Sequence, residues 1–411
     1  MASRRRADAA RNDELFLDAG LDLLRERGPD RFAALELART AGLTTGAVYA
    51  RYENPAEILV GLWQNRISTP MEMFVGNSLA ALSTAERHGD AHAMTSRALS
   101  NPSGPLRPGV SVLIAATRVP ELAEVVGPDV ERWMSELGLN GDLSDPIVAS
   151  RRCLLAAVMG TLLFDTADLF EPADWTFARR VAEAMHVYGS VGRFPLPAPV
   201  IPSAPVVSTD NESRDALVNG AARVIAHGGI ERATTQRIAR AAGMTPSALF
   251  AEYRTRPELF ADVANKLLER MYAGTRAVGD SYDSVSTWQE NFLTEKLAAY
   301  RGLLQPESSD HRRLRLEFHL ASIHDPMIGA TLRRVDTEVN HSVSRSSAGG
   351  LGLDPSVLLL TTRFIRSCGL GGMLLQELVG GFDTLDLRHL FEPLVDLVES
   401  TAPGAVTTPN R

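Results

Sequence analysis

Two stretches of the sequence carry hydroxyl and small side chains in a pattern that suits contact with phosphate groups. They are T-T-G-A at residues 44–47 and T-P-S-A at residues 245–248. The threonine at the start of each stretch can cap a helix by accepting a hydrogen bond from an amide two or three residues later. The free amides and the positive dipole end at such a helix start favour a nearby anion. These residues therefore predict phosphate binding.

The elements that must position these stretches are pairs of short helices joined by a tight turn. Gly42 and Gly243 fall in the two turns, where a left-handed backbone favours glycine. They are 201 residues apart, and at this offset 11 of 41 positions are identical between residues 20–60 and 221–261. The pattern predicts the same helix-turn-helix twice. Most DNA-binding proteins of this kind obtain two copies by dimerising, whereas this chain carries both itself.

Both copies resemble the DNA-binding domain of the tetracycline-repressor (TetR) family of transcription regulators. The first copy matches the family pattern at Ala38, Ala41, Gly42, Thr44, Gly46, Tyr49, Tyr52 and Glu57. The second matches it at Ala239, Ala242, Gly243, Thr245, Tyr253, Arg256 and Glu258, with Phe250 in place of the tyrosine. The resemblance implies dimers with a variable helical ligand-binding domain. It also implies that a ligand bound there weakens DNA binding.

The resemblance and the residue types together give the candidate DNA-binding residues. They are Arg4, Arg5, Arg6, Thr44, Thr45, Gly46, Tyr49, Arg51, Tyr52, Thr234, Thr235, Thr245, Pro246, Ser247, Phe250, Tyr253, Arg254 and Arg256. The first three form an arginine arm, expected to be flexible and to precede the first helix, from where it could reach phosphates or the minor groove. For Tyr49 and Phe250, packing between the helices is an equally good interpretation.

Each copy departs from the family pattern in a different way. Pro55 stands where a lysine is common, and Ala33-Ala34 replaces the pair Thr234-Thr235 of the second copy. Glu252 occupies a position where a polar or basic residue is usual, and a carboxylate facing phosphate would be repelled. Arg51 and the arginine arm add positive charge to the first copy. We therefore expect the first copy to bind DNA more strongly, at an operator with dissimilar half-sites.

Composition places the chain among globular proteins of more than one domain. It has 411 residues, 45% of them hydrophobic and 22% charged, and a net charge of −8. A DNA-binding face needs only local positive charge, so this average does not exclude a nucleic-acid partner. The two cysteines fit a reducing compartment, and the N-terminus lacks a signal-peptide pattern. Arg363 and Arg366 interrupt the most apolar stretch, residues 357–375, so we expect a buried helix, no membrane span and a cytoplasmic protein.

The chain divides at a proline-rich segment that follows residue 191. Five prolines between residues 195 and 205 predict a semi-extended linker, and strand-like alternation is almost absent elsewhere. The expected fold is all-α with two TetR-like halves. The expected domains are a helix-turn-helix domain at 1–65, a helical regulatory domain at 66–191, the linker at 192–213, a second helix-turn-helix domain at 214–271 and a second regulatory domain at 272–400. Beyond the motif, residues 117–122 weakly resemble 323–328, and residues 151–163 resemble 362–375; chance explains each match equally well.

Some residues of the regulatory segments could line a ligand cavity. The candidates are Trp133, Met159, Phe164, Phe318, Phe364 and Met373, although core packing explains them more simply. The histidines, densest at 311, 319 and 324, lack metal-ligand spacing, and satisfied or solvent-facing side chains are the expected role. The glycines of G-L-G-G at 369–372 are expected to allow close helix packing.

The leading hypothesis is a DNA-binding transcription regulator, a repressor by preference, whose two halves pair within one chain. Its partners would be a double-stranded operator and an unknown small-molecule effector, with a homodimer of chains left open. The alternative is a ligand-sensing or protein-interaction protein that keeps the fold but has weakened or lost DNA binding. No nucleophile–base pair, metal site or cofactor motif favours an enzyme, so neither a catalytic role nor a cofactor is expected.

Overall fold

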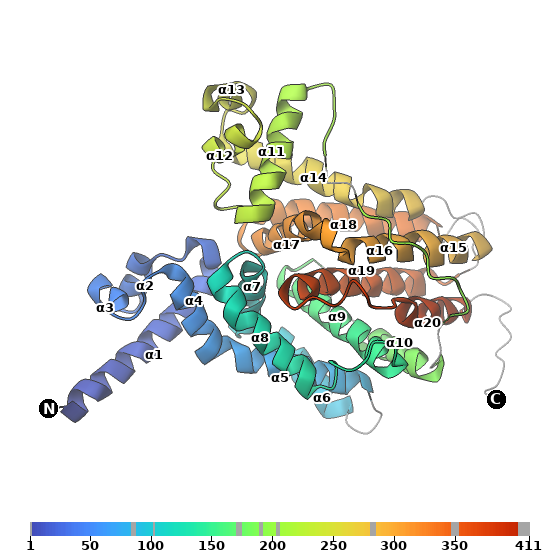
Figure 1. Cartoon of the computed structure of the whole chain (residues 1–411), viewed down its shortest axis with the longest axis horizontal. Helices are drawn as coiled ribbons and strands as arrows, with labels where there is room; N and C mark the ends of the chain where they lie inside the picture. The colour runs from blue at the N-terminus through green and yellow to red at the C-terminus, as the bar shows by residue number, and fades with distance from the viewer. Residues whose placement is uncertain are drawn as a thin grey trace.

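A computed structural model of the chain describes residues 2–83, 88–101, 103–169, 175–188, 192–202, 206–279, 285–346 and 353–401. Within these ranges the side chains of residues 2–10, 83, 88–93, 175, 186–188, 274–279, 285–287 and 343–346 are outside the description. Every regular element in the described part is helical (Figure 1). The expected all-α fold is therefore confirmed.

The first half of the chain contains ten α-helices in its described residues. They are α1 Ala2–Arg27, α2 Ala34–Thr40, α3 Thr45–Tyr49, α4 Pro55–Leu62, α5 Ser68–Ser83, α6 His88–Leu99, α7 Leu106–Ala116, α8 Pro120–Glu136, α9 Pro146–Thr166 and α10 Trp175–Tyr188. A 3₁₀ turn, η1 Pro29–Arg31, follows α1, and a π-helical turn, η2 Trp63–Ile67, joins α4 to α5. The helical run is therefore continuous from residue 55 to 83, and the domain boundary expected at residue 65 coincides with no break in the backbone.

The described residues of the second half contain helices in a similar order. They are α11 Glu212–Gly228, α12 Thr235–Ala241, α13 Pro246–Glu252, α14 Arg256–Gly279, α15 Val285–Asn291, α16 Leu297–Leu304, α17 Ser309–His324, α18 Pro326–Ser346, α19 Pro355–Leu378 and α20 Arg388–Glu399, with the shorter turns η3 Phe292–Lys296 and η4 Pro306–Ser308. Pro120 and Pro326 both open a helix, 206 residues apart. Asp145 and Asp354, which are 209 residues apart, cap the starts of α9 and α19, and a proline follows each of them in the chain.

The first helix differs from the expectation at its start. It begins at Ala2, so Arg4, Arg5 and Arg6 belong to α1 and do not form a flexible arm ahead of it. The physical reason is local: the segment from Ala2 to Arg11 has no glycine or proline and is rich in alanine and arginine, which favour helix. The side chains of these arginines lie outside the described part.

The two halves meet through the long apolar helices α9 and α19, which run side by side in Figure 1. Glycines allow this close approach. A Cβ at Gly160 would lie 1.7 Å from the carbonyl oxygen of Ser367, and one at Gly371 would lie 1.9 Å from that of Ala156. The close-packing prediction for 369–372 is confirmed. Helices α10 and α20 complete the contact, each packing against the other and against α9.

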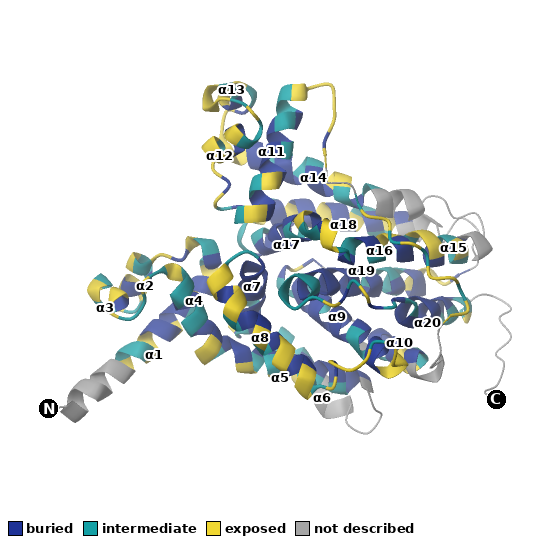
Figure 2. Cartoon of the chain, viewed as in Figure 1, coloured by how far each residue is buried: buried dark blue, intermediate teal, exposed yellow. Residues whose placement is uncertain are grey.

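Helices α9 and α19 are also the two described helices long and apolar enough to cross a membrane. Their most apolar windows are 78% buried inside the protein, where they pack on each other. This burial agrees with the expected buried helix at 357–375, because the core helix of a globular domain has the same composition. Figure 2 shows the buried residues concentrated in these central helices.

The proline-rich linker is extended where it is described, and it is docked onto the second half. The amide of Val200 donates to the carbonyl of Ala298 at 2.9 Å, and the Arg301 guanidinium donates to the carbonyl of Pro197. Gly302 makes room for the linker backbone, because a Cβ there would lie 1.7 Å from the Val200 carbonyl oxygen. The linker is thus a fixed part of the structure between residues 192 and 202.

Candidate nucleic-acid interface

Each half begins with three helices that form the expected helix-turn-helix; we call α1–α3 the first unit and α11–α13 the second unit. Gly42 and Gly243 have φ angles of 67° and 70°, the left-handed conformation predicted for the turns. The hydroxyl of Thr44 accepts from the amide of Ala47 at 3.2 Å, and Thr245 does the same for Ala248. Both predicted caps are confirmed, so the starts of α3 and α13 are built in the same way.

Much of the two capped helices is exposed (Figure 2). Gly46, Ser247 and Pro246 are exposed, and Thr45 is half-buried. Tyr49 is 63% exposed and Phe250 is 53% exposed, so neither ring packs between the helices. These side chains therefore form an accessible face on each unit.

Arg51 and Glu252, which occupy corresponding positions, both turn back onto the first helix of their unit. Arg51 forms an ion pair with Asp13 and lies over the ring of Phe16 at 5.4 Å. Glu252 lies 3.4 Å from the guanidinium of Arg214, which corresponds to Asp13. The same ion pair is thus present twice with its charges exchanged. The carboxylate of Glu252 faces an arginine, which removes the reason for expecting it to repel phosphate.

Two of the candidate tyrosines have a structural role. Tyr253 is 1% exposed, and its hydroxyl donates to the carboxylate of Asp262. Tyr52 is half-buried against Gly61, where a Cβ would lie 3.2 Å from the ring. Burial raises the pKa of both hydroxyls. We correct the assignment of Tyr253, since a buried hydroxyl that is already donating cannot reach a phosphate.

Three arginines of the second unit that sequence reasoning missed lie together on α12 and the turn before it. Arg232, Arg237 and Arg240 are exposed, and with Thr234 and Gln236 they border one open surface. Their spacing, with Arg237 and Arg240 three residues apart on one helix, was the available signal. The hydroxyl of Thr234 caps α12 by accepting from the amide of Arg237 at 3.3 Å.

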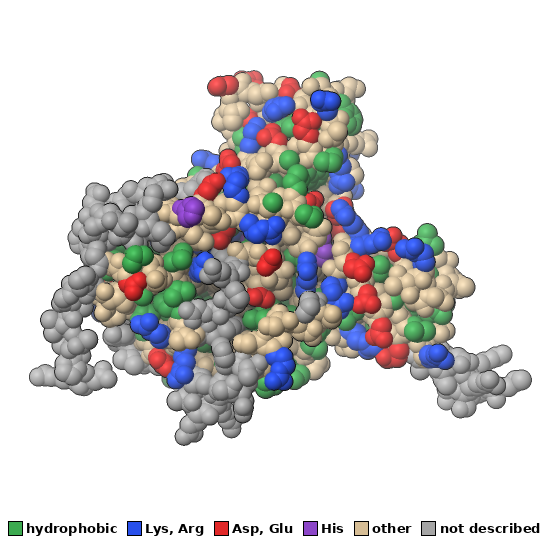
Figure 3. Space-filling model, turned by 180° about the vertical axis from the view of Figure 1, so that it is seen from behind, with side chains coloured by type: hydrophobic (Ala, Val, Ile, Leu, Met, Phe, Trp, Pro, Cys, Tyr) green, Lys and Arg blue, Asp and Glu red, His purple; other side chains and the backbone are tan. Residues whose placement is uncertain are grey.

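The corresponding surface of the first unit is less basic. Residues 31–55 contain three arginines and two glutamates, whereas residues 232–256 contain five arginines and one glutamate. Ala33 gives α2 no side-chain cap, and Leu35 is 68% exposed at the position of Gln236. On the face shown in Figure 3, basic and acidic side chains are interspersed. The charges described here favour the second unit, contrary to the expectation that the first binds more strongly.

The remaining candidates lie beside the second unit. Thr235 is the first residue of α12 and is half-buried. Arg254 and Arg256 are exposed around the start of α14. The amide of Arg254 donates to the carboxylate of Glu258 at 2.9 Å, and the Arg256 guanidinium lies over the ring of Phe260 at 4.9 Å. Both arginines can therefore extend the basic face of α12.

Both units join the body at a shared junction near the ends of α7 and α17. Gly28 and Gly229 have φ angles of 77° and 80°; a Cβ on Gly28 would lie 2.8 Å from the ring of His324, and one on Gly229 would lie 2.8 Å from Arg118. Arg118 is almost fully buried and donates to Asp30 and Glu317 at 2.6 Å each. On the other side His324 is 3.4 Å from the hydroxyl of Ser111, and Glu231, which corresponds to Asp30, pairs instead with the exposed Arg31 at 2.6 Å.

A cavity of about 460 Å³ lies in the second half, between α14, α16, α17 and α19. Of the six ligand-binding candidates from the sequence, Met373 lines this cavity. The other five do not line it and are buried in the core: Trp133, Met159, Phe164, Phe318 and Phe364. The charged lining residues on four different elements could not be brought together from the sequence.

The three histidines of α17 keep their neutral form; His311 and His319 are buried, and His324 is half-buried. Burial lowers the pKa of His311 and His324 to about 4 and that of His319 to about 3. Within the residues that the structure describes, neither ring nitrogen of His319 has a hydrogen-bond partner, which corrects the expectation that this histidine is satisfied or solvent-facing. In the described part of the chain, no group of three or more His, Cys, Asp or Glu side chains could hold a metal ion.

Comparison with known proteins agrees with the geometry of the second unit. Residues 217–263 match the model of the family described as bacterial regulatory proteins, tetR family. The match supports a transcriptional regulator of the TetR type. These residues run from α11 into α14 and include the whole turn and α13.

Two further comparisons add little. The crystal structure of a protein described as a TetR-family transcriptional regulator from Rhodococcus sp. is 20% identical, with a TM-score of 0.36, and the alignment covers 46% of this chain and 99% of that one. At this TM-score we draw nothing further from the likeness. A search of the curated proteins found no match.

Proposed function

We propose that the chain is a DNA-binding transcription regulator whose two halves pair within one polypeptide and control DNA binding through a small ligand. The observation that carries the proposal is the second unit, where an exposed capped helix lies next to the arginines of α12. In helix-turn-helix proteins the second helix enters the major groove and the first crosses the backbone. That arrangement would place Ser247 at base edges and Arg237 near phosphates.

The intramolecular pair is supported by the order of the helices and by the contact of α9 with α19. In the described residues, ten helices of the second half follow ten of the first half in a similar order. The spacing of Pro120 and Pro326 continues the similarity beyond the first three helices of each half. In this proposal the gene encodes a fused pseudo-dimer with two different DNA-binding surfaces. Repression, a cytoplasmic location and the absence of enzymatic activity are parts of the same proposal.

The test is selection of bound duplexes from a random pool, followed by fluorescence anisotropy and light scattering. We expect one chain per duplex and a site with dissimilar halves, spaced by about one DNA turn or a multiple of it. A perfect palindrome bound by two chains would favour pairing of like halves across a homodimer. No enrichment of any duplex would favour the alternative of a sensor or interaction protein without DNA binding.

A further inference from the structure

The cavity of the second half contains more positive than negative charge. Its lining includes four basic side chains and one acidic side chain, namely Arg270, Lys296, Arg315, Arg366 and Glu295. Arg366 is 3% exposed and pairs with Asp336, which lies behind the lining. Arg270 and Glu295 are exposed, so the unpaired positive charge that is removed from solvent lies on the half-buried Lys296 and Arg315. Such charge is costly unless an anion compensates for it.

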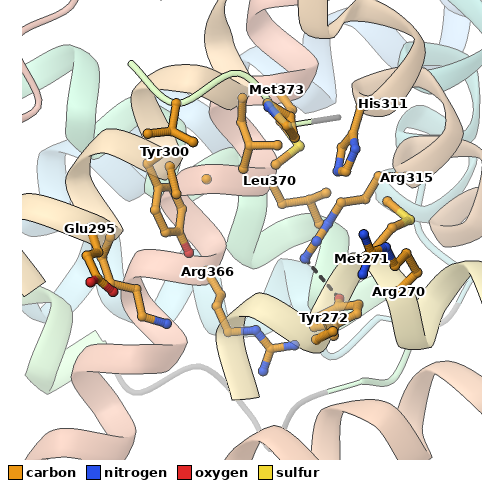
Figure 4. A pocket seen from close by; sticks show the side chains of 17 residues that line it. Arg270, Met271, Tyr272, Glu295, Tyr300, His311, Arg315, Arg366, Leu370 and Met373 are labelled. Carbon is orange, nitrogen blue, oxygen red and sulfur yellow. Dashed lines mark hydrogen bonds between the residues drawn. The ribbon is translucent and has the colours of Figure 1, made fainter. Parts of the chain in front are cut away.

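Lys296 and Arg315 carry most of this excess toward the cavity. Among the described residues, the Lys296 ammonium has no hydrogen bond or ion pair, and burial together with the Arg366 charge lowers its pKa to about 8. Arg315 donates from one terminal nitrogen to the hydroxyl of Tyr272 at 2.9 Å (Figure 4), while its Nε has no partner within the described part of the chain. Both side chains can therefore still bind an acidic group.

The rest of the cavity wall is apolar and aromatic. Met271, Leu370 and Met373 border it, and the ring of Tyr300 forms a further side (Figure 4). Gly369 makes room for that ring, since a Cβ there would lie 2.2 Å from it. A volume of about 460 Å³ is within the range of small-molecule sites and equals on the order of fifteen water volumes. An apolar body with one acidic end would satisfy both parts of the wall.

The first half has no comparable set of charges at the corresponding positions. At the spacing set by Pro120 and Pro326, Gly109 corresponds to Arg315. Met71, which corresponds to Tyr272, fills the space: it has no exposed surface, and a Cβ on Gly109 would lie 2.5 Å from its sulfur. The two glycine contacts between α9 and α19 share an offset of 211 residues (Gly160 with Gly371), and at this offset Leu155 corresponds to Arg366. The first half is thus packed with apolar atoms where the second half is hollow and basic.

We propose that the cavity of the second half binds one organic acid per chain, its anionic group between Lys296 and Arg315 and its apolar body against Tyr300 and Met373. This proposal rests on the proposed function, in which a ligand controls DNA binding, and it names the chemical class of that ligand. It also makes the two halves unequal: one binds the ligand and the other does not.

The linker connects this site to the second unit along the chain. Val200 and Pro202 form part of the cavity wall. Further along, the amide and carbonyl of Val207 bond to the side chain of Asn219 in α11 at 2.8 and 2.9 Å. A ligand that shifts the wall therefore acts first on the helix that supports α12 and α13.

The test uses three probes of similar size on the full chain: 4-phenylbutyrate, 4-phenylbutan-1-ol and 4-phenylbutylamine. By isothermal titration calorimetry we expect the acid to bind with a stoichiometry of one. Because a hydrogen bond to a charged group contributes about 1.5–3 kcal/mol, the acid should bind roughly tenfold or more tightly than the alcohol. Equal affinity for acid and alcohol, two acids per chain, or no binding of the acid would overturn the proposal.

Variants then locate the acid. Lys296→Met and Arg315→Met should each weaken binding of 4-phenylbutyrate at least about tenfold while leaving the alcohol unchanged. Arg334→Met is the matched control, because Arg334 is an exposed arginine of α18 that pairs with Glu269 and Glu338 outside the cavity. Unchanged acid binding in both cavity variants would show that the acid binds elsewhere. Anisotropy on the selected duplex is scored separately, so loss of acid binding and loss of DNA binding are distinguishable failures.

Discussion

The first and second units share a backbone plan but differ in how charge is used. In the first unit few arginines are exposed. Glu36 forms an ion pair with Arg27, and Arg51 forms one with Asp13. In the second, Arg237 and Arg240 remain on an exposed surface, while the acidic Glu252 is held by Arg214. The difference teaches that the charge of a residue in the motif does not predict DNA contact; its partner on the first helix decides where it points.

The largest expected effect concerns the junction that supports the two units. Arg118→Met removes the partner of two buried carboxylates, Asp30 and Glu317, and should cost about 3–5 kcal/mol of unfolding free energy. His324→Leu, at the corresponding position, should cost far less, since its bond to Ser111 is long. Urea unfolding followed by circular dichroism measures both. Equal losses would mean that the junction is symmetric in energy as well as in geometry.

The second expected effect is a pH dependence of stability that comes from α17 of the second half and has no counterpart in α7 of the first half. Two buried histidines of α17, His311 and His319, have pKa values of about 4 and about 3, below the ordinary 6.5. Between pH 6.5 and 4 the unfolded chain binds protons that the folded chain does not, so stability is lost as pH falls through this window. Helix α7 of the first half contains no histidine.

His319→Phe should therefore reduce the acid-induced loss of unfolding free energy, by on the order of 3 kcal/mol. The measurement is the urea midpoint at a series of pH values. His227→Gln, at an exposed histidine of α11, is the control and should leave the pH dependence in place. If both variants follow the wild-type profile, His319 titrates normally in the folded protein.

The third effect asks which unit binds DNA more strongly. The double change Arg237→Ala and Arg240→Ala should weaken binding about a hundredfold at moderate salt and lower the salt slope by nearly two, because each lost phosphate contact contributes about 0.9. The corresponding pair Glu36→Ala and Arg39→Ala should change the slope by less than about one. Anisotropy titrations at several salt concentrations give the slopes. A larger effect from the first unit would reverse the comparison.

The smallest effect concerns the exchanged ion pairs. Arg51→Glu places two carboxylates together and should cost up to about 1 kcal/mol, the range for partly exposed pairs. Adding Asp13→Arg recreates the arrangement of the second unit and should restore the urea midpoint. If stability returns but DNA binding does not, Arg51 contacts DNA in the complex after releasing Asp13.

Local features of the sequence predicted much of the fold. The left-handed Gly42 and Gly243, the caps by Thr44 and Thr245, and the buried helix at 357–375 all follow from residue types within a few positions of each other. The partners of Arg51 and Glu252 could not be predicted in this way, because they lie on another helix 38 residues earlier in the chain. The cavity was missed for the same reason, since its charges come from α14, η3, α17 and α19.

The exchanged ion pairs also bear on how a chain with two similar segments avoids misassembly. While the protein is being made, α3 is complete long before α11, and α13 emerges when a finished α1 is already available as a wrong docking site. Docked there, Glu252 would face Asp13, and Arg51 would be left to face Arg214. Each wrong pairing brings like charges together. Because the two units place the acidic and the basic residue of this ion pair on opposite helices, the repulsion at this one contact disfavours domain swapping between them.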